Sequence, residues 1–183
     1  MLKLQVNNEY ARLKAVLFGT AQNNGPTPSA ESCYDPNSLS HVLAGTYPTE
    51  ADMQNEMSAV LAVFQKYEVE VFRPSIIANC NQIFARDIAF VIDTKFIKSN
   101  ILPDRAEEYE ALEILLKKFN PEDIIELPED CHVEGGDVVV SNDYIFIGVY
   151  SGLDYPDHIT ARTNLQAAEA IQKLFPLKTV KTF

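Results

Sequence analysis

Several features that would identify a secreted or nucleic-acid-binding protein are scarce in this chain of 183 residues. It has no tryptophan, three cysteines, and 15 lysines and arginines against 26 acidic residues. An odd number of cysteines at unrelated spacings fits neither a disulfide framework nor a zinc ribbon. The formal net charge of -11 argues against nucleic acid or an anionic membrane as a partner, because both require a basic face.

Long apolar runs are also missing. The first eight residues contain no apolar core long enough for a signal peptide, and no stretch approaches the length of a membrane span. We therefore expect a cytoplasmic protein with no membrane partner. What is present, 46% hydrophobic and 22% charged residues, is a globular composition that can bury a core.

Hydrophobic periodicity predicts an α/β protein in which one unit recurs along the chain, at about 10–74, 79–127 and 132–183. Each unit consists of one strand or a hairpin, then a helix, then a returning strand. We expect strands at 13–18, 69–72, 88–92, 95–98, 123–127, 137–140, 144–149 and 179–183, and helices at 50–66, 105–119 and 163–175. Such a unit cannot cover its own apolar faces, so neighbouring units must do so. The alternative is a plain α+β domain whose hairpins resemble each other by coincidence.

Local signals support parts of this assignment. Thr49 and Asp52 form a capping box before the first helix, and Asp93-Thr94 is a two-residue hairpin connection that lacks the usual glycine. The segment from Thr20 to Thr49 is too long for a simple connection. We expect an irregular loop there, and it is a candidate lid over a site.

Two carboxylates stand immediately before the second and third hairpins. Asp87 follows Arg86, and Glu134 precedes Gly135-Gly136. Carboxylates match the planar fork of five donors that a guanidinium presents, and they bind it through paired, charge-assisted bonds. The pair predicts a small cationic ligand shaped like arginine.

Four motifs in order carry a resemblance to a known superfamily. Asn81, Phe84, Arg86 and Asp87 match the pattern Asn-x-x-Phe-x-Arg-Asp, and the run 134–137 matches Glu-Gly-Gly-Asp. Arg105 is followed by acidic residues, and Arg162-Thr163 opens the third helix. The chain resembles the guanidino-modifying enzymes of the pentein superfamily, namely arginine deiminase, dimethylarginine dimethylaminohydrolase and the amidinotransferases.

The resemblance implies a five-bladed α/β propeller of ββαβ units, of which residues 1–183 would supply about three blades as a truncated single domain. It implies an arginine deiminase-like hydrolase or an amidinotransferase that acts on arginine or a related guanidino compound through a covalent cysteine thiouronium. The family's histidine and cysteine would follow Phe183, so this chain alone should be inactive. No cofactor or metal is expected. The uncovered blade should lead to self-association or to binding of the missing C-terminal half.

The resemblance also assigns roles to individual residues. Asp87 and Glu134 become the catalytic pair that binds the guanidinium. Four further residues would contact the substrate: Phe84 by stacking on the guanidinium, Asn81 at the far polar end of the substrate, and Arg105 and Arg162 at its α-carboxylate. Structural support is assigned to Arg86, Gly135, Gly136 and Asp137.

Each role has an alternative. Asp87 and Glu134 could be caps, Asn81 a turn former, and Arg105 a solvated residue paired at the surface with Glu108 or Glu110. The glycine pair indicates either a positive φ or a close backbone approach. A neighbouring negative charge should weaken Cys80 as a nucleophile. The whole chain could instead be a non-catalytic module that binds a cationic ligand or a protein, or a generic α/β domain that dimerises through a sheet edge.

Overall fold

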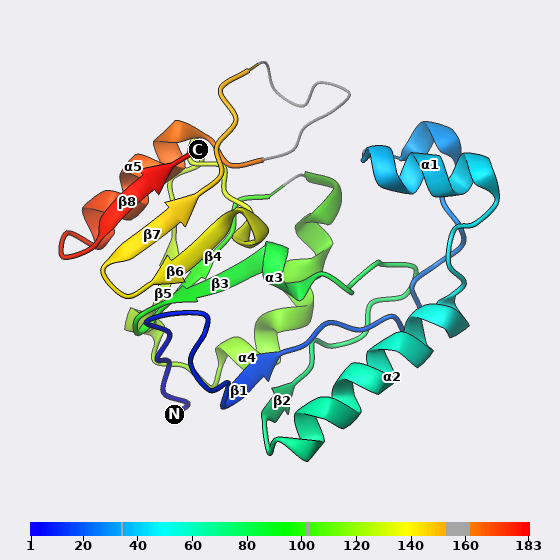
Figure 1. Cartoon of the computed structure of the whole chain (residues 1–183), viewed down its shortest axis with the longest axis horizontal. Coiled ribbons are helices and arrows are strands. Elements are labelled where there is room, and N and C mark those ends of the chain that lie inside the picture. The colour runs from blue at the N-terminus through cyan, green and yellow to red at the C-terminus, as the bar shows by residue number, and fades with distance from the viewer. Residues whose placement is uncertain (34, 102, 153–161) are drawn as a thin grey trace.

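The computed structural model of the protein describes residues 1–33, 35–101, 103–152 and 162–183. Three small sheets follow one another along the chain, as Figure 1 shows. In the second and third sheets an antiparallel hairpin is joined by a third strand parallel to its second strand. The strands are β3 (Ala89–Ile92), β4 (Lys95–Lys98) and β5 (Ile124–Glu126), then β6 (Val138–Ser141), β7 (Tyr144–Ile147) and β8 (Thr179–Thr182). The predicted recurrence of one unit is therefore present in these two sheets.

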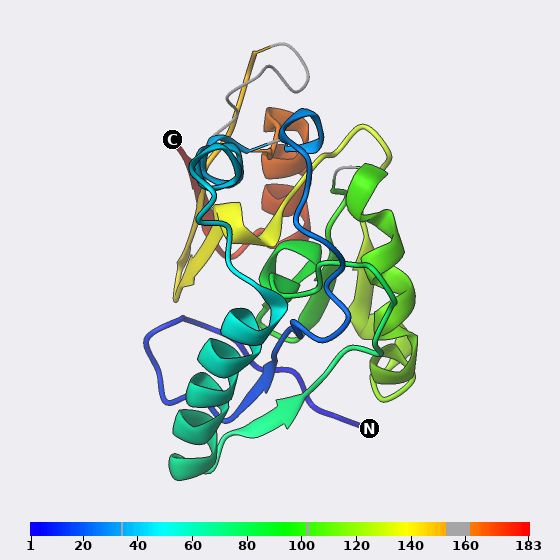
Figure 2. The same cartoon turned by 90° about the vertical axis from the view of Figure 1, so that its right-hand side faces the viewer.

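The first unit is simpler. Its strands β1 (Ala15–Leu17) and β2 (Glu70–Phe72) pair in parallel, and α2 (Glu50–Lys66) connects them. The bounds predicted for α2 are confirmed, and so is its capping box, because the backbone and side chain of Thr49 and Asp52 bond each other reciprocally. Phe64 of α2 meets Phe18 edge to face, with ring centroids 5.3 Å apart, so α2 lies beside the first sheet (Figure 2).

The segment from Thr20 to Thr49 is not wholly irregular, and this prediction was wrong. It contains a short 3₁₀ turn, Ala30–Ser32, and the helix α1, Pro36–Ala44. The caps of α1 are conventional: Asp35 accepts a hydrogen bond from the Ser38 amide at 2.8 Å, and Gly45 ends the helix at a φ of 65°. No residue of α1 is buried. Its apolar residues Leu39, Val42 and Leu43 stand at helical spacing, but they span a single turn and none of them is buried.

The prediction of a single α-helix at 105–119 was also wrong. A 3₁₀ helix, Pro103–Leu112, leads into one short α-helical turn, α4, Glu113–Leu116. A further short helix, α3 (Ala85–Ile88), stands immediately before β3. The third helix, α5, runs from Leu165 to Leu174, inside the predicted bounds.

Helical segments and sheets alternate through the core. Leu112, Leu115 and Phe119 pack on the second sheet, and Leu17 and Phe72 of the first sheet lie against the same cluster. On the other side of the second sheet, α5 shares a larger cluster with the third sheet, which comprises Phe90, Ile92, Ile97, Val138, Val140, Ile145, Ile147, Ala167, Ala168 and Ile171. The helical segment of the second unit and α5 therefore each contact two consecutive sheets, as neighbouring units must if they cover each other's apolar faces.

The N-terminal segment links the second and third units. Val6 forms an antiparallel bridge with Asp93 at the first hairpin turn, and Asn8 forms one with Ser141 at the second. Ile92 pairs with Lys95, so the predicted two-residue connection is confirmed, and Asp93 within it adopts a φ of 52° without being a glycine. None of the helices in the described part of the chain is long and apolar enough to cross a membrane.

Candidate active site

Two short helical turns present the predicted acids. Asp87 belongs to α3, and its amide donates to the Phe84 carbonyl at 3.0 Å. Glu134 precedes a 3₁₀ turn, Gly135–Asp137, in which the Asp137 amide donates to the Glu134 carbonyl, also at 3.0 Å. Since each turn leads directly into the first strand of a hairpin, the two hairpins fix where the two carboxylates lie.

The glycine pair allows the two turns to approach each other closely. An ideal Cβ on Gly135 would lie 2.1 Å from the Arg86 carbonyl oxygen, and one on Gly136 would lie 2.7 Å from Oδ1 of Asp87. The close-approach explanation is therefore confirmed. The positive-φ explanation is wrong, because the glycines with positive φ in the described ranges are Gly25 and Gly45.

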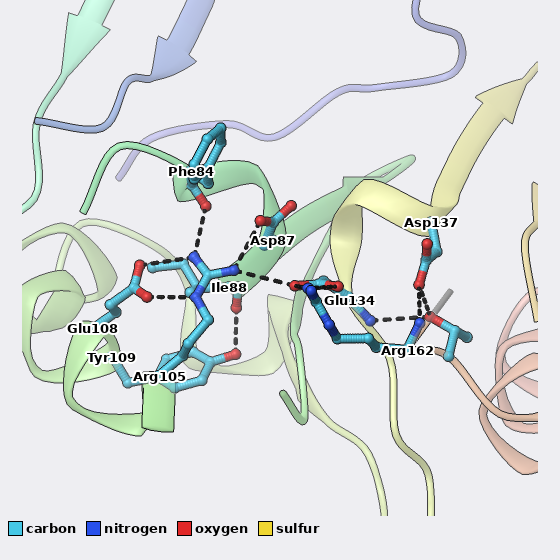
Figure 3. A network of polar contacts seen from close by, with 10 residues as sticks. Phe84, Asp87, Ile88, Arg105, Glu108, Tyr109, Glu134, Asp137 and Arg162 are labelled. Carbon is cyan, nitrogen blue, oxygen red and sulfur yellow. Dashed lines mark hydrogen bonds and ion pairs between the residues drawn. The ribbon is translucent and has the colours of Figure 1, made fainter. Parts of the chain in front are cut away.

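Asp87 and Glu134 face the same guanidinium nitrogen, which belongs to the protein itself. Nη1 of Arg105 donates to Oδ2 of Asp87 at 2.8 Å and to Oε1 of Glu134 at 3.1 Å, as Figure 3 shows. We call these two carboxylates the acid pair. The sequence motifs had predicted an acid pair around a guanidinium, but not that Arg105 would supply one.

Every N–H donor of Arg105 has an acceptor. Nε donates to Glu108 at 2.6 Å, and Nη2 donates to Glu108 at 3.1 Å and to the Phe84 carbonyl at 3.3 Å. Because a guanidinium has five N–H donors, all of the donors of Arg105 are used within the protein in this structure, and its predicted role at a substrate carboxylate stays a prediction. The surface-pair alternative is wrong, since Arg105 is 7% exposed and Glu108 2%.

Arg162 binds the same acid from the third unit. Its Nη1 donates to both carboxylate oxygens of Glu134 at 2.8 Å. Its backbone amide donates to Asp137 at 2.9 Å, and the Thr163 hydroxyl donates to the same oxygen at 2.8 Å. The Thr163 hydroxyl also accepts from the Glu134 amide at 3.1 Å. Asp137 and Thr163 therefore join the turn that carries Glu134 to the segment before α5.

The other predicted site residues lie at the edge of this arrangement. Asn81 is exposed, and its Oδ1 accepts from the Ile83 amide at 3.2 Å, as in a turn. The Phe84 ring is 59% exposed and points away from Arg105 in Figure 3. Arg86 donates to the Gly135 carbonyl at 2.8 Å, to Glu9 at 2.7 Å, and to the Val138 carbonyl. Contacts of this kind suit the supporting role predicted for Arg86.

Burial perturbs the carboxylates. It raises the pKa of Glu134, and the charge of Asp87 adds to this, while Arg162 and Arg105 oppose it. Burial likewise raises the pKa of Asp137, although the hydrogen bond from Thr163 acts to lower it. Burial disfavours the charged form of Arg105, but the bonds and charges of Glu108 and Asp87 outweigh it and raise the pKa of the guanidinium. The site therefore favours a cation next to the acid pair.

The charges of this cluster do not balance. Asp87, Glu108, Glu134 and Asp137 supply four carboxylates, and Arg105 and Arg162 supply two guanidiniums. An additional small cation would reduce the repulsion among the acids.

Glu108 and Thr163 are the contributors that sequence reasoning missed. In a 3₁₀ helix the side chains at i and i+3 are eclipsed, which stacks Arg105 over Glu108. An Arg-x-x-Glu spacing was visible in the sequence, but only burial distinguishes it from a weak surface pair. Thr163 had no comparable signal beyond its place beside Arg162.

Comparison with known proteins gives a fold but no family assignment from sequence. No protein family model matches the chain. An uncharacterized protein of Bacillus subtilis, YkgA, is 31% identical over 102 residues, which cover 54% of this chain and 31% of that protein.

Solved structures of guanidino-modifying enzymes share the fold of the whole chain. The inosamine-phosphate amidinotransferase of Streptomyces griseus gives a TM-score of 0.71 at 17% identity, and an amidinotransferase of saxitoxin biosynthesis from Microseira wollei gives 0.72 at 17%. They cover 99% and 98% of this chain. DDAH from Pseudomonas aeruginosa, in a complex with citrulline, gives 0.62 at 17% identity over 93% of the chain.

The chain spans 61 to 63% of the length of these three structures. The resemblance to guanidino-modifying enzymes expected from the motifs is confirmed at the level of the fold. An α/β fold with mixed sheets is likewise confirmed, whereas the five-bladed closure remains a prediction.

Proposed function

We propose that this chain binds a guanidinium between Asp87 and Glu134, as part of an enzyme that modifies the guanidino group of arginine or a related compound. One observation supports the proposal above all others: a single guanidinium nitrogen, Nη1 of Arg105, donates to both carboxylates, at 2.8 and 3.1 Å. The shared fold of amidinotransferases and of DDAH supports the same chemical class.

The acid pair would act by positioning and electrostatics. Charge-assisted bonds to two carboxylates fix the plane of a guanidinium, which leaves a face of its central carbon open to attack. In the proposed reaction a cysteine thiolate adds to this carbon, and the C–N bond to the leaving amine breaks as that amine takes a proton from a histidine. Water then resolves the thiouronium in a hydrolase, or a second amine does so in an amidinotransferase.

The thiolate and the imidazole would come from polypeptide outside these 183 residues, so the chain alone is proposed to be inactive. Cys80 is a poor candidate for the thiolate. Burial raises the pKa of Cys80, and the charges of Glu108 and Glu107 raise it further, whereas the charge of Arg105 lowers it. A thiol with a raised pKa holds little thiolate near neutral pH.

Calorimetric titration of the full chain with methylguanidinium tests the binding site. We expect saturable binding, weakened about tenfold or more in D87N and in E134Q, because each loses a charge-assisted acceptor. E113Q removes one negative charge from an exposed pair with Lys117 and should bind as the original chain does. Methylammonium at equal ionic strength should not saturate. A lack of methylguanidinium binding both by the original chain and by a variant without Arg105, whose Nη1 is bonded to the acid pair, would refute the proposal.

A non-catalytic binding module is the second candidate. It would need only the acid pair and no nucleophile, and Cys80, whose pKa burial raises, supplies a nucleophile to neither candidate. Incubation of the complete gene product with arginine separates the two candidates. Release of ammonia, or transfer of the amidino group to an added amine, supports the enzyme, whereas binding without turnover supports the module.

A further inference from the structure

Arg105 occupies the position that a guanidinium ligand would take. Its Nη1 is bonded to both members of the acid pair, Asp87 and Glu134. We propose that Arg105 is an intramolecular competitor, so that a guanidinium ligand binds only by displacing Nη1 from the acid pair. This inference rests on the proposed function, because it assumes that the acid pair is the ligand site.

The carboxylate oxygens that point inward are already bonded. Glu134 accepts from Arg162 through both oxygens, and its Oε1 accepts from Arg105 as well. On Asp87, Oδ2 accepts from Arg105, while Oδ1 lies against the backbone at Gly136. A guanidinium ligand between the facing oxygens would compete with Arg105 for the same acceptors, and two guanidiniums at one point would repel each other.

Glu108 acts as the positioning residue of this arrangement. It holds Nε and Nη2 of Arg105 through two bonds, at 2.6 and 3.1 Å, and thereby aims Nη1 at the acid pair. The next residue, Tyr109, fixes the same 3₁₀ segment through its hydroxyl, which donates to the carbonyls of Ile88 and Ser99. With the backbone held in this way, release of Arg105 is a movement of the side chain about its Glu108 anchor.

This arrangement determines which ligands can bind. A ligand must replace bonds that a planar, charged fork now makes, so compact ammonium ions and neutral amides are poor substitutes. We expect the affinity for a guanidinium to be lower than the acid pair alone could provide, because part of the binding free energy is used to break the bonds of Arg105.

The test compares variants that remove the competitor. R105Q, and R105Q/E108Q with the net charge of the original chain retained, should bind methylguanidinium about tenfold more tightly or better in calorimetric titration, as loss of a competing charge-assisted bond predicts. R12Q/E68Q removes an exposed pair, 3.9 Å apart, and should leave the affinity unchanged. Equal or weaker affinity in both Arg105 variants would overturn the inference while the proposed function stands. Failure of every variant and of the original chain to bind would instead overturn the proposed function.

Thermal unfolding covers the case in which R105Q folds poorly, since it leaves Asp87, Glu108 and Glu134 without their shared cation. Methylguanidinium should raise the Tm of R105Q and of R105Q/E108Q more than that of the original chain, because ligands stabilise the state they bind. Methylammonium at the same concentration should not produce this difference. An equal rise in all three proteins would contradict competition by Arg105.

Discussion

Glu134 connects more of the site than any other carboxylate described above. It accepts from Arg105 and Arg162, and its backbone amide donates to Thr163. It is 6% exposed, and the two guanidiniums offset part of the free-energy cost of burying its charge. Loss of either cation would leave an inadequately compensated buried charge.

The raised pKa of Glu134 predicts how stability depends on pH. Its folded-state pKa is above the ordinary 4.5, so between the two values the folded state binds more protons than the unfolded state. The free energy of unfolding must then decrease as pH rises through the window above 4.5. Urea unfolding from about pH 4.5 to pH 7 measures this decrease. It should be smaller in E134Q, and an identical pH dependence in both proteins would contradict the assignment.

Gly135 is predicted to tolerate no side chain. A Cβ there would lie 2.1 Å from the Arg86 carbonyl oxygen, and neither backbone can move without displacing the turn that carries an acid. We expect G135A to lower the free energy of unfolding by about 2 kcal/mol or more. G45A is the control, because its Cβ meets open space and only its φ of 65° is unfavourable, at a cost of about 1 kcal/mol. Equal losses in the two variants would contradict the close-approach explanation.

At the level of elements, the helical segment of the second unit has a geometry that suits its contacts. A 3₁₀ helix aligns Arg105 with Glu108, and the Tyr109 hydroxyl ties the same segment to Ile88 and Ser99. An α-helix would place the i+3 residue about 300° around the axis rather than directly above. The tertiary bonds therefore favour the tighter helix, although the apolar spacing alone indicated an α-helix.

The capping box of α2 should contribute measurably to stability. Oγ1 of Thr49 accepts from the Asp52 amide at 3.2 Å, and the Asp52 carboxylate accepts from the Thr49 amide at 3.1 Å. T49A should lower the free energy of unfolding by about 1 kcal/mol, measured by urea denaturation. S58A, which removes an exposed hydroxyl bonded to a carbonyl within the helix, should be neutral or slightly stabilising. A neutral T49A would show that α2 is held by packing alone.

At the level of the whole molecule, the alternation of helical segments and sheets leaves one outer sheet face without a helix in the described structure. On the third sheet, Val139 lies opposite Phe146, whose ring is 6.0 Å from those of Tyr144 and Phe183. The exposed fractions are 45% for Val139, 45% for Tyr144 and 78% for Phe183. Such an apolar face is typical of an interaction surface.

We predict that this face causes self-association of the isolated chain. Sedimentation equilibrium should detect dimers or larger species whose fraction rises with concentration, and V139K/F183K should shift them towards monomer. L43K changes an exposed leucine of α1, 72% accessible, and should not alter the distribution. A monomeric chain at all concentrations would contradict the prediction.

Much of the fold could be predicted from the sequence. The hairpins, α2 and α5 were found because burial of one face imposes a period on the sequence, as at Met57 and Phe64 of α2. Helix α1 was missed although Asp35, Pro36 and Gly45 mark its ends, because its apolar residues extend over only one turn and none of them is buried.

The sequence by itself determined which residue types carry the candidate chemistry. Asp87 and Glu134 precede two equivalent hairpins, and a carboxylate before each hairpin suffices to predict a cation site. Only the tertiary structure decided which cation lies there. The 3₁₀ segment of the second unit passes beside the turn of the third unit and places Arg105 between the two acids. Such a contact depends on how two consecutive units pack on each other, for which a sequence pattern of local period holds no signal.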